Sequence, residues 1–206
     1  TAEAAPSAAP FMNPQRMIGN TGEYGEFVIP LSNPNAKSKA RMDDFDFAAM
    51  AWTLTAHEAR PGHELQFASM VEQGMSVARA RFAFNSTNVE GWGLYSEAMI
   101  LPYMPPEGQL VSLQARLLRM ARALLDPQIN LGRMTPAQAK DFLMREVVLS
   151  EPFAQSEVDR YSYRMPGQAT AYYYGYVKLR ALKTQAEIAL GDRFSLKAFN
   201  DFIIAQ

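Results

Sequence analysis

The pattern of apolar and polar positions predicts a protein built mainly from α-helices. From Asp43 onward, apolar residues recur every three or four positions, which is the period of one helix face. Proline, glycine and capping residues divide this region into segments, because each of them begins or ends a helix. We expect helices at about 43–58, 62–74, 88–100, 107–125, 135–149, 150–164 and 168–190, and a last one capped by Ser195.

Two features of this pattern are specific enough to compare with a structure. The segment at 107–125 carries its apolar residues on one stripe, formed by Leu110, Leu113, Leu117, Met120, Ala121 and Leu124. Asp126-Pro127 is expected to end that helix, since proline lacks an amide proton and clashes with the preceding turn. Thr135 and Gln138 have the spacing of a capping box, with Pro136 at the first helical position.

Before residue 43 the sequence predicts irregular chain with one candidate strand. Residues up to about 20 show no regular pattern, and in the segment 25–30 β-favouring residues lie between turn formers. This segment is either a plain extended loop or an edge strand that could hydrogen-bond an extended peptide. We therefore divide the chain into an irregular linker with one edge-strand candidate, residues 1–42, and a helical catalytic domain, residues 43–206.

Composition favours one soluble globular domain and excludes several classes of partner. The 206 residues are 48% hydrophobic and 20% charged, with a net charge of −1, and no basic stripe indicates nucleic-acid binding. No apolar run approaches the ~20 residues that a membrane span needs. Cysteine is absent, so a periplasmic or secreted location stays open. Both ends suggest a C-terminal piece of a longer protein, whose remaining segments would be partners of this one.

Both histidines of the chain lie in one short segment, His57-Glu58-Ala59-Arg60-Pro61-Gly62-His63-Glu64. Histidine is the commonest protein ligand for zinc, and a glutamate directly after the first histidine serves as general base in helical zinc-protease motifs. On an unbroken helix, six residues would leave the two rings about 120° apart. Pro61-Gly62 must kink or stop the helix, which would allow both imidazoles to face one point.

A third zinc ligand must be an oxygen, because hydrolytic zinc sites take three protein ligands and a water, and the chain has no cysteine. Glu90 and Glu97 are seven residues apart and lie on one helix face. Glu90 is the preferred ligand, although Thr87 and Glu90 also have the spacing of a capping box. Glu97 is the alternative ligand, or else a residue that contacts substrate.

These motifs resemble the bacterial domain-of-unknown-function family 885 (DUF885), which is grouped with gluzincin-type zinc metallopeptidases. The resemblance rests on the block from His57 to Gln66, on Glu90-Gly91-Trp92-Gly93-Leu94-Tyr95, and on the later blocks Asp159-Arg160-Tyr161 and Pro166-Gly167-Gln168-Ala169 with Tyr172 and Gly175. It implies a mainly α, zincin-like helical metallopeptidase fold with a short edge strand or small sheet near the N-terminal part. It also implies that relatives are much longer than this chain.

The resemblance further implies which distant residues reach the cleft. Arg160 and Tyr172 are expected to stabilise the transition state, and Gln168 to bind substrate, as is Gln66 at the end of the first block. The chain departs from the family pattern at two places. Many members have a histidine where this sequence has Glu64, and another where it has Asn130.

Together these observations predict a zinc-dependent hydrolase, and most simply a metallopeptidase that cleaves short peptides. His57, His63 and Glu90 would hold the zinc, and Glu58 would act as general base. Two alternatives remain open. One is a metal-dependent hydrolase of non-peptide amides or esters; the other is a non-catalytic helical scaffold or binding module in which the His57–His63 segment is only a turn.

Overall fold

The computed structural model describes residues 9–29, 44, 45 and 47–205. Two short strands, β1 (Phe11–Asn13) and β2 (Glu26–Val28), form an antiparallel pair in which Phe11 is opposite Val28. Helices make up most of the remainder, and in chain order they are α1 (Ala48–Glu58), α2 (His63–Glu72), α3 (Val77–Phe82), α4 (Ser86–Ile100), α5 (Pro106–Asn130), α6 (Pro136–Glu146), α7 (Glu151–Asp159), α8 (Thr170–Leu190) and α9 (Leu196–Ile204). The prediction of a mainly helical chain with a small sheet is confirmed.

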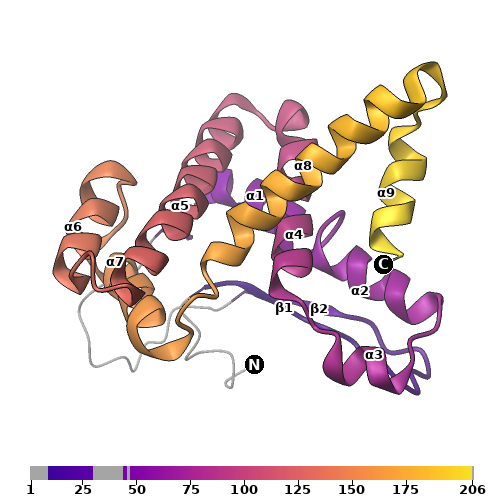
Figure 1. Cartoon of the computed structure of the whole chain (residues 1–206), viewed down its shortest axis with the longest axis horizontal. Helices are drawn as coiled ribbons and strands as arrows, with labels where there is room; N and C mark the ends of the chain where they lie inside the picture. The colour runs from indigo at the N-terminus through magenta and orange to yellow at the C-terminus, as the bar shows by residue number, and fades with distance from the viewer. Residues whose placement is uncertain (1–8, 30–43, 46, 206) are drawn as a thin grey trace.

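Four helices, α1, α4, α5 and α8, meet at the centre of the molecule, and α8 crosses α4 (Figure 1). At that crossing the two backbones come so close that a Cβ on Gly91 would lie 2.7 Å from the carbonyl carbon of Gly175. A Cβ on Gly175 would lie 2.1 Å from the backbone oxygen of Thr87. Only glycine permits such an approach. The crossing therefore fixes the first turns of α8 against α4.

Apolar residues collect in two clusters on either side of this centre. One joins α5, α6 and α7, and includes Leu118, Leu125, Leu143, Val147, Phe153 and Val158. The other joins α4, α8 and α9 around Trp92, Leu94, Tyr95, Tyr176, Phe199 and Ile204. The polar site described below lies between the two clusters, so its helices are anchored by apolar packing at both ends.

The orientation of α5 is unusual for an amphipathic helix. Its apolar stripe is largely exposed, with exposed fractions of 69%, 48%, 42%, 44% and 48% for Leu110, Leu113, Leu117, Met120 and Leu124. The opposite face is buried and contains Arg119, Arg122 and Asp126. These polar groups face the centre because carboxylates of α4 and α7 pair with the two arginines. The inner face of α5 therefore serves the polar site.

This orientation predicts opposite outcomes for two adjacent leucines. Leu125 is fully buried and Leu124 is 48% exposed. Leu125→Ala should lower the free energy of unfolding by about 2–5 kcal/mol, because it leaves a cavity in the core. Leu124→Ala should change it by less than about 1 kcal/mol. Urea unfolding of both variants measures the difference, and equal losses would show that α5 is rotated relative to this structure.

Several predicted boundaries were wrong. The first helix begins at Ala48, not near Asp43. The helix α5 continues through Pro127 to Asn130, where proline removes only one bond of the last turn. The predicted helix 150–164 changes at Arg160 into a π-helical turn, Arg160–Arg164. The helix expected to reach residue 149 ends at Glu146.

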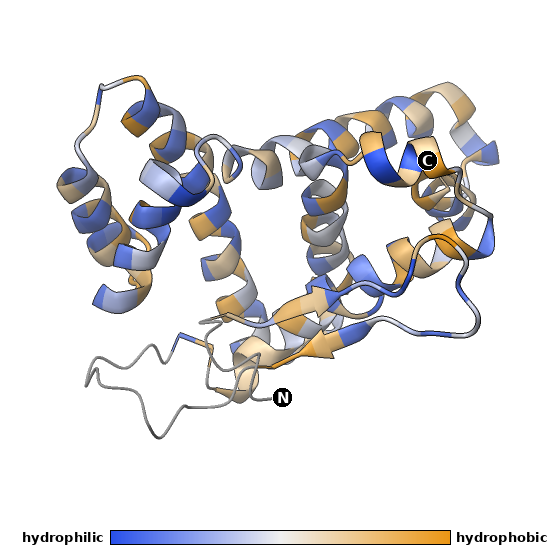
Figure 2. Cartoon of the chain, turned by 90° about the horizontal axis from the view of Figure 1, so that it is seen from below, coloured by the Kyte–Doolittle hydropathy of each residue, from blue (hydrophilic) through white to orange (hydrophobic). Residues whose placement is uncertain are grey.

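The N-terminal region contains more structure than the sequence predicted. The strand candidate is confirmed as β2, and β1 lies where irregular chain was expected. Figure 2, viewed from below, shows the two strands in front of the helices, with apolar residues along both. Within the proposed linker, residues 1–8 and 30–42 lie outside the described residues. Across the described ranges, no helix is long and apolar enough to cross a membrane.

Candidate metal centre

A tight turn brings His57 and His63 to the same place. His57 is in the last turn of α1 and His63 is the first residue of α2. A Cβ on Gly62 would lie 1.8 Å from the backbone oxygen of His57, so no other residue fits at this position. The α4 residues Trp92 and Ser96 hold the turn, because they donate to the Pro61 carbonyl at 2.9 and 3.3 Å. The two imidazole rings end with centroids 4.6 Å apart and planes at 83°.

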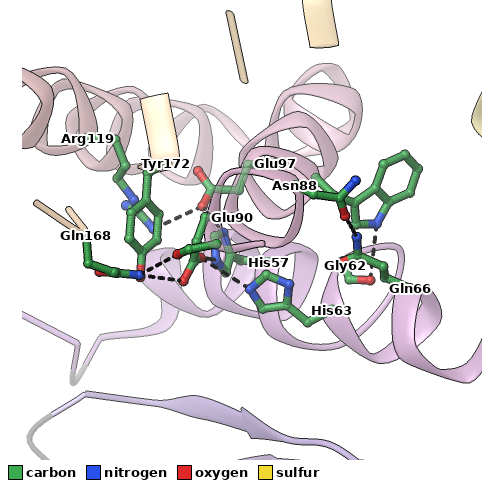
Figure 3. A network of polar contacts seen from close by, with 12 residues as sticks. His57, Gly62, His63, Gln66, Asn88, Glu90, Glu97, Arg119, Gln168 and Tyr172 are labelled. Carbon is green, nitrogen blue, oxygen red and sulfur yellow. Dashed lines mark hydrogen bonds and ion pairs between the residues drawn. The ribbon is translucent and has the colours of Figure 1, made fainter. Parts of the chain in front are cut away.

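Glu90 completes a three-residue cluster with the two histidines (Figure 3). Its Oε2 lies 3.3 Å from Nε2 of His57 and 3.5 Å from Nε2 of His63. One ligand atom from each residue lies within 4.8 Å of the other two. Ligands placed tetrahedrally at about 2.0–2.2 Å from zinc lie about 3.4 Å from one another. The distances to Glu90 therefore fit a single zinc ion.

Electrostatics also favour a cation at this point. Burial penalises a charged His57, but its hydrogen bonds with Glu90 and Glu97 outweigh that cost and raise the pKa of His57 to about 10. Burial likewise disfavours a charged Glu90, yet the hydrogen bonds and charges of both histidines hold its pKa far below the usual range. The carboxylate is therefore ionised, and a metal cation would replace the imidazole proton of His57 that faces Glu90.

Glu97 lies on the other side of His57 from Glu90. It is completely buried, and its Oε1 accepts from Nδ1 of His57 at 2.8 Å and from Arg119 at 3.0 Å. Burial raises the pKa of Glu97, but the Arg119 charge and the His57 hydrogen bond hold it below its usual value. When the ring nitrogen that does not bind the metal donates to a carboxylate, the tautomer and orientation of a metal-binding histidine are fixed. Glu97 therefore has the position of a supporting residue, away from the cluster of candidate ligand atoms.

Between the two glutamates, Gly93 makes room for the imidazole. A Cβ at this position would lie 2.5 Å from Cε1 of His57. The sequence resemblance included Gly93, but spacing alone gave it no role. The glycine allows the ring of His57 to lie between Glu90 and Glu97 on one face of α4.

The alternative explanation for Glu90, a capping box with Thr87, was wrong. Asn85 caps α4, with its side chain accepting from the backbone amides of Thr87 and Asn88. Asn85 caps a helix well because its short side chain reaches the unpaired amides of the first turn. The carboxylate of Glu90 is therefore not used in capping and faces the histidines.

The distant residues Gln168 and Arg160 reach the same centre. Gln168 donates to Oε1 of Glu90 at 3.5 Å and to Oγ of Ser86 at 2.9 Å. Arg160 donates to the side-chain oxygen of Gln168, and at 3.0 Å to the hydroxyl of Tyr172. One hydrogen-bonded chain thus runs from the π-helical turn to Glu90.

Of three consecutive tyrosines, Tyr172 is the one that faces the centre. Its ring stacks on His57 with centroids 6.2 Å apart and an angle of 20° between the planes. Tyr173 instead contacts Tyr176, and Tyr174 is 52% exposed. Burial raises the pKa of Tyr172, and the negative charge of Glu90 adds to this effect. Its hydroxyl therefore stays protonated and able to donate.

A cleft of about 360 Å³ opens beside His57. Glu58 lines this cleft directly next to His57 and is partly exposed. Residues from several other segments contribute to its wall, among them Ala9, Arg119, Arg122, Glu157, Arg160 and Tyr172. The volume is at the small end of the range for ligand sites, which is about 300–1,000 Å³.

Three other residues from the sequence analysis lie outside the cleft. Gln66 is 1% exposed and donates to Asn88 at 2.9 Å, so it joins α2 to α4 and does not line the cleft. Glu64 pairs with Arg60 on the outside of the turn. Asn130 donates to Asp126 at 2.8 Å and to the Tyr161 carbonyl at 3.2 Å, which gives it a role in fixing α5.

Sequence reasoning missed the buried ion pairs that support the centre. Arg122 donates to both oxygens of Glu157 at 2.6 and 2.9 Å, and its guanidinium lies 4.8 Å from the ring centroid of Tyr172. The charge of Arg122 offsets burial and lowers the pKa of Glu157 to about 2. Asp126 accepts from the backbone amides of Gly167 and Ala169 at 2.8 and 3.0 Å. In the sequence, these residues were marked only by being charged positions within helices that otherwise follow an apolar pattern.

Comparisons with known proteins agree with this architecture. A family model described as "Bacterial protein of unknown function (DUF885)" matches residues 1–206. A solved "putative lipoprotein" from Colwellia psychrerythraea is similar over 100% of this chain and 34% of its own, with 30% identity and a TM-score of 0.83. A "putative lipoprotein of unknown function" from Shewanella oneidensis is similar over 98% of this chain and 37% of its own, with 23% identity and a TM-score of 0.80. No curated protein matches the chain.

Proposed function

Because the chain belongs to the bacterial protein family DUF885, whose description assigns no activity, we propose its function from the site itself: a zinc-dependent peptidase that acts on short peptides. The observation that carries this proposal is the convergence of His57, His63 and Glu90, whose ligand atoms lie within 4.8 Å of one another. Two imidazoles and one carboxylate form the ligand set of thermolysin-type catalytic zinc sites. We extend the proposal to membership of the gluzincin-type clan with a zincin-like fold.

The supporting residues fit such a centre. Nδ1 of His57 is hydrogen-bonded to the Glu97 carboxylate, as is usual for metal-binding histidines. Gln168 donates to Oε1 of Glu90, the oxygen that does not contact the histidines. When bound, zinc would supply a Lewis acid and bring the pKa of its water to about 7. The chain itself then has to orient the substrate, move a proton and donate to the developing oxyanion.

Each of these tasks has a candidate residue. Glu58 lines the cleft next to a ligand without being one, so it can take the proton of the attacking water and pass it to the leaving amine. Tyr172 keeps its proton and can donate to the oxyanion of the tetrahedral intermediate. Arg160 fixes the Tyr172 hydroxyl and Gln168, so we assign it a positioning role beside the oxyanion.

A location outside the cytoplasm is part of the proposal. Its support is that both similar solved proteins are described as putative lipoproteins. The chain spans about a third of the length of those relatives, so the activity, substrate and location of the whole protein are proposed by the same reasoning.

Metal content and turnover test the proposal together. The purified chain should retain about one zinc per molecule by elemental analysis, and chelation should abolish cleavage of short peptides until zinc is restored. Absence of bound metal would favour the helical scaffold. Zinc-dependent cleavage of esters or non-peptide amides, with peptides untouched, would favour the second alternative.

The supporting role of Glu97 leads to a separate prediction. Glu97→Gln should weaken zinc affinity about 10–100-fold, the usual effect of losing a carboxylate that orients a ligand. Glutamine can still accept from Nδ1 of His57, so the fold should be retained; thermal unfolding of the metal-free variant checks this. Competition with a zinc chelator measures the affinity. An unchanged affinity would show that Glu97 serves only Arg119.

A further inference from the structure

We propose that Arg164 forms a carboxylate-binding subsite in the cleft, which selects peptide substrates by a carboxylate near the cleaved bond. This inference rests on the proposed peptidase function and names its substrate class. It starts from the charges on the cleft wall, where, among the described residues, four arginines face two glutamates, Glu58 and Glu157.

Three of the four arginines are already engaged. Arg119 donates to Glu97 at 3.0 Å, and Arg122 makes two bonds to Glu157. Arg160 lies 3.5 Å from Glu157 and uses one terminal nitrogen for Gln168 and Tyr172. These groups hold the site together and have little capacity left for a ligand.

Arg164 differs from the other three. Within the part of the chain that the structure describes, no carboxylate forms an ion pair with it, and its bonds go to the Ser156 carbonyl and, at 2.9 Å, to the Ser156 hydroxyl. Both bonds use the same terminal nitrogen, so the guanidinium is held against α7 while its other donors stay available. Arg164 is exposed at the edge of the cleft.

The π-helical turn explains how Arg160 and Arg164 reach one cleft. The Met165 amide donates to the Arg160 carbonyl at 2.9 Å, which is the i to i+5 bond of a π-helix. Side chains four residues apart lie on one side of such a turn, as they do on an α-helix. Single π turns are often found at functional sites. Here the turn places an unpaired cation next to the residue that fixes Tyr172.

A carboxylate is the ligand that fits this arrangement. The remaining two nitrogens of the guanidinium keep free donors for a carboxylate oxygen. A charged acceptor gives a stronger bond than a neutral one. Arg160 adds positive charge close by, since Glu157 is shared between it and Arg122. In a peptide the carboxylate is either the free C-terminus or an acidic side chain, and the small cleft favours the end of a short peptide.

Three matched peptides test the inference on the zinc-loaded protein: a short peptide with a free C-terminus, its C-terminal amide, and an amide that carries one glutamate side chain. We expect kcat/KM about 10-fold or more higher for the free acid than for the plain amide. Arg164→Gln should bring that ratio near one through a higher KM for the acid, with the amide unchanged, and Arg164→Lys should restore part of it. Arg145→Gln, an exposed arginine of α6 paired with Asp141 at 2.7 Å, is the matched control and should keep the preference.

The outcomes separate the inference from the proposed function. Preference for the glutamate-bearing amide would keep the subsite and assign it to a side chain. Equal rates for all three peptides, or a preference that survives Arg164→Gln, would overturn the subsite while the peptidase stands. If no peptide is cleaved, the proposed peptidase function fails, and calorimetry then tests the subsite by comparing binding of the acid and the amide to the zinc-loaded Glu58→Gln variant. Equal affinities would overturn the subsite. Tighter binding of the acid, lost on adding Arg164→Gln, would support it.

Discussion

Replacing Glu58 with glutamine should reduce peptide turnover by about 10²–10⁴-fold, the usual contribution of a positioned general base. Glutamine has almost the same shape but cannot accept and return a proton. Glu58 follows His57, which we propose as a zinc ligand, and lines the cleft, so the substitution removes the proposed base without removing a proposed ligand. Zinc content and the midpoint of thermal unfolding should stay at the values of the parent. Steady-state kinetics on the zinc-loaded variant measure the effect, which should be mainly in kcat.

Glu64 provides a matched control within the same segment. It follows the second histidine as Glu58 follows the first, but it pairs with Arg60 on the outer side of the turn. Glu64→Gln should therefore leave turnover nearly unchanged and cost less than about 1 kcal/mol of stability. Equal kinetic losses in the two variants would exclude a specific proton transfer by Glu58. Near-normal activity in Glu58→Gln would exclude it as well.

Local sequence signals predicted local structure well. The capping box of Thr135 and Gln138 is present as expected, because both partners lie within one turn. The helix break at Pro61-Gly62 is also present, and both histidines face one point as the geometric argument required. These features arise from backbone chemistry within a few residues, so the sequence alone indicates them, although Trp92 and Ser96 of α4 also hold the Pro61-Gly62 turn.

Signals that depend on distant partners could not be read from the sequence. The apolar stripe of α5 gave no indication that its polar face would be buried, since that depends on carboxylates of α4 and α7. Arg164 had no pattern of its own, and the π-helical turn that places it left no periodic signature. Tyr172 was ambiguous beside Tyr173 and Tyr174 until the crossing of α4 and α8 fixed the rotation of α8.

The choice between Glu90 and Glu97 shows this limit most clearly. Spacing placed both on one face of α4, and both do contact His57. They contact opposite nitrogens of the ring, which lies between them because Gly93 has no side chain. His63 lies on the side of Glu90, and Arg119 lies on the side of Glu97. Only the three-dimensional arrangement favours Glu90 as the proposed ligand and Glu97 as the proposed orienting residue.

Glu90→Gln should therefore weaken zinc binding far more than Glu97→Gln does. A neutral amide oxygen is a poor replacement for a carboxylate that contacts both imidazoles, so affinity should fall well beyond the about 10–100-fold expected for an orienting residue. His57→Ala and His63→Ala should have effects as large as Glu90→Gln. Chelator competition and elemental analysis of the four variants measure this order, with circular dichroism to confirm that each is folded.

If Glu97→Gln lost zinc while Glu90→Gln retained it, Nδ1 of His57 and Glu97 would be the ligands and the centre would lie on the Arg119 side. If His63→Ala kept a full zinc complement, the turn at Pro61-Gly62 would have no role in metal binding, and the proposed centre would be wrong.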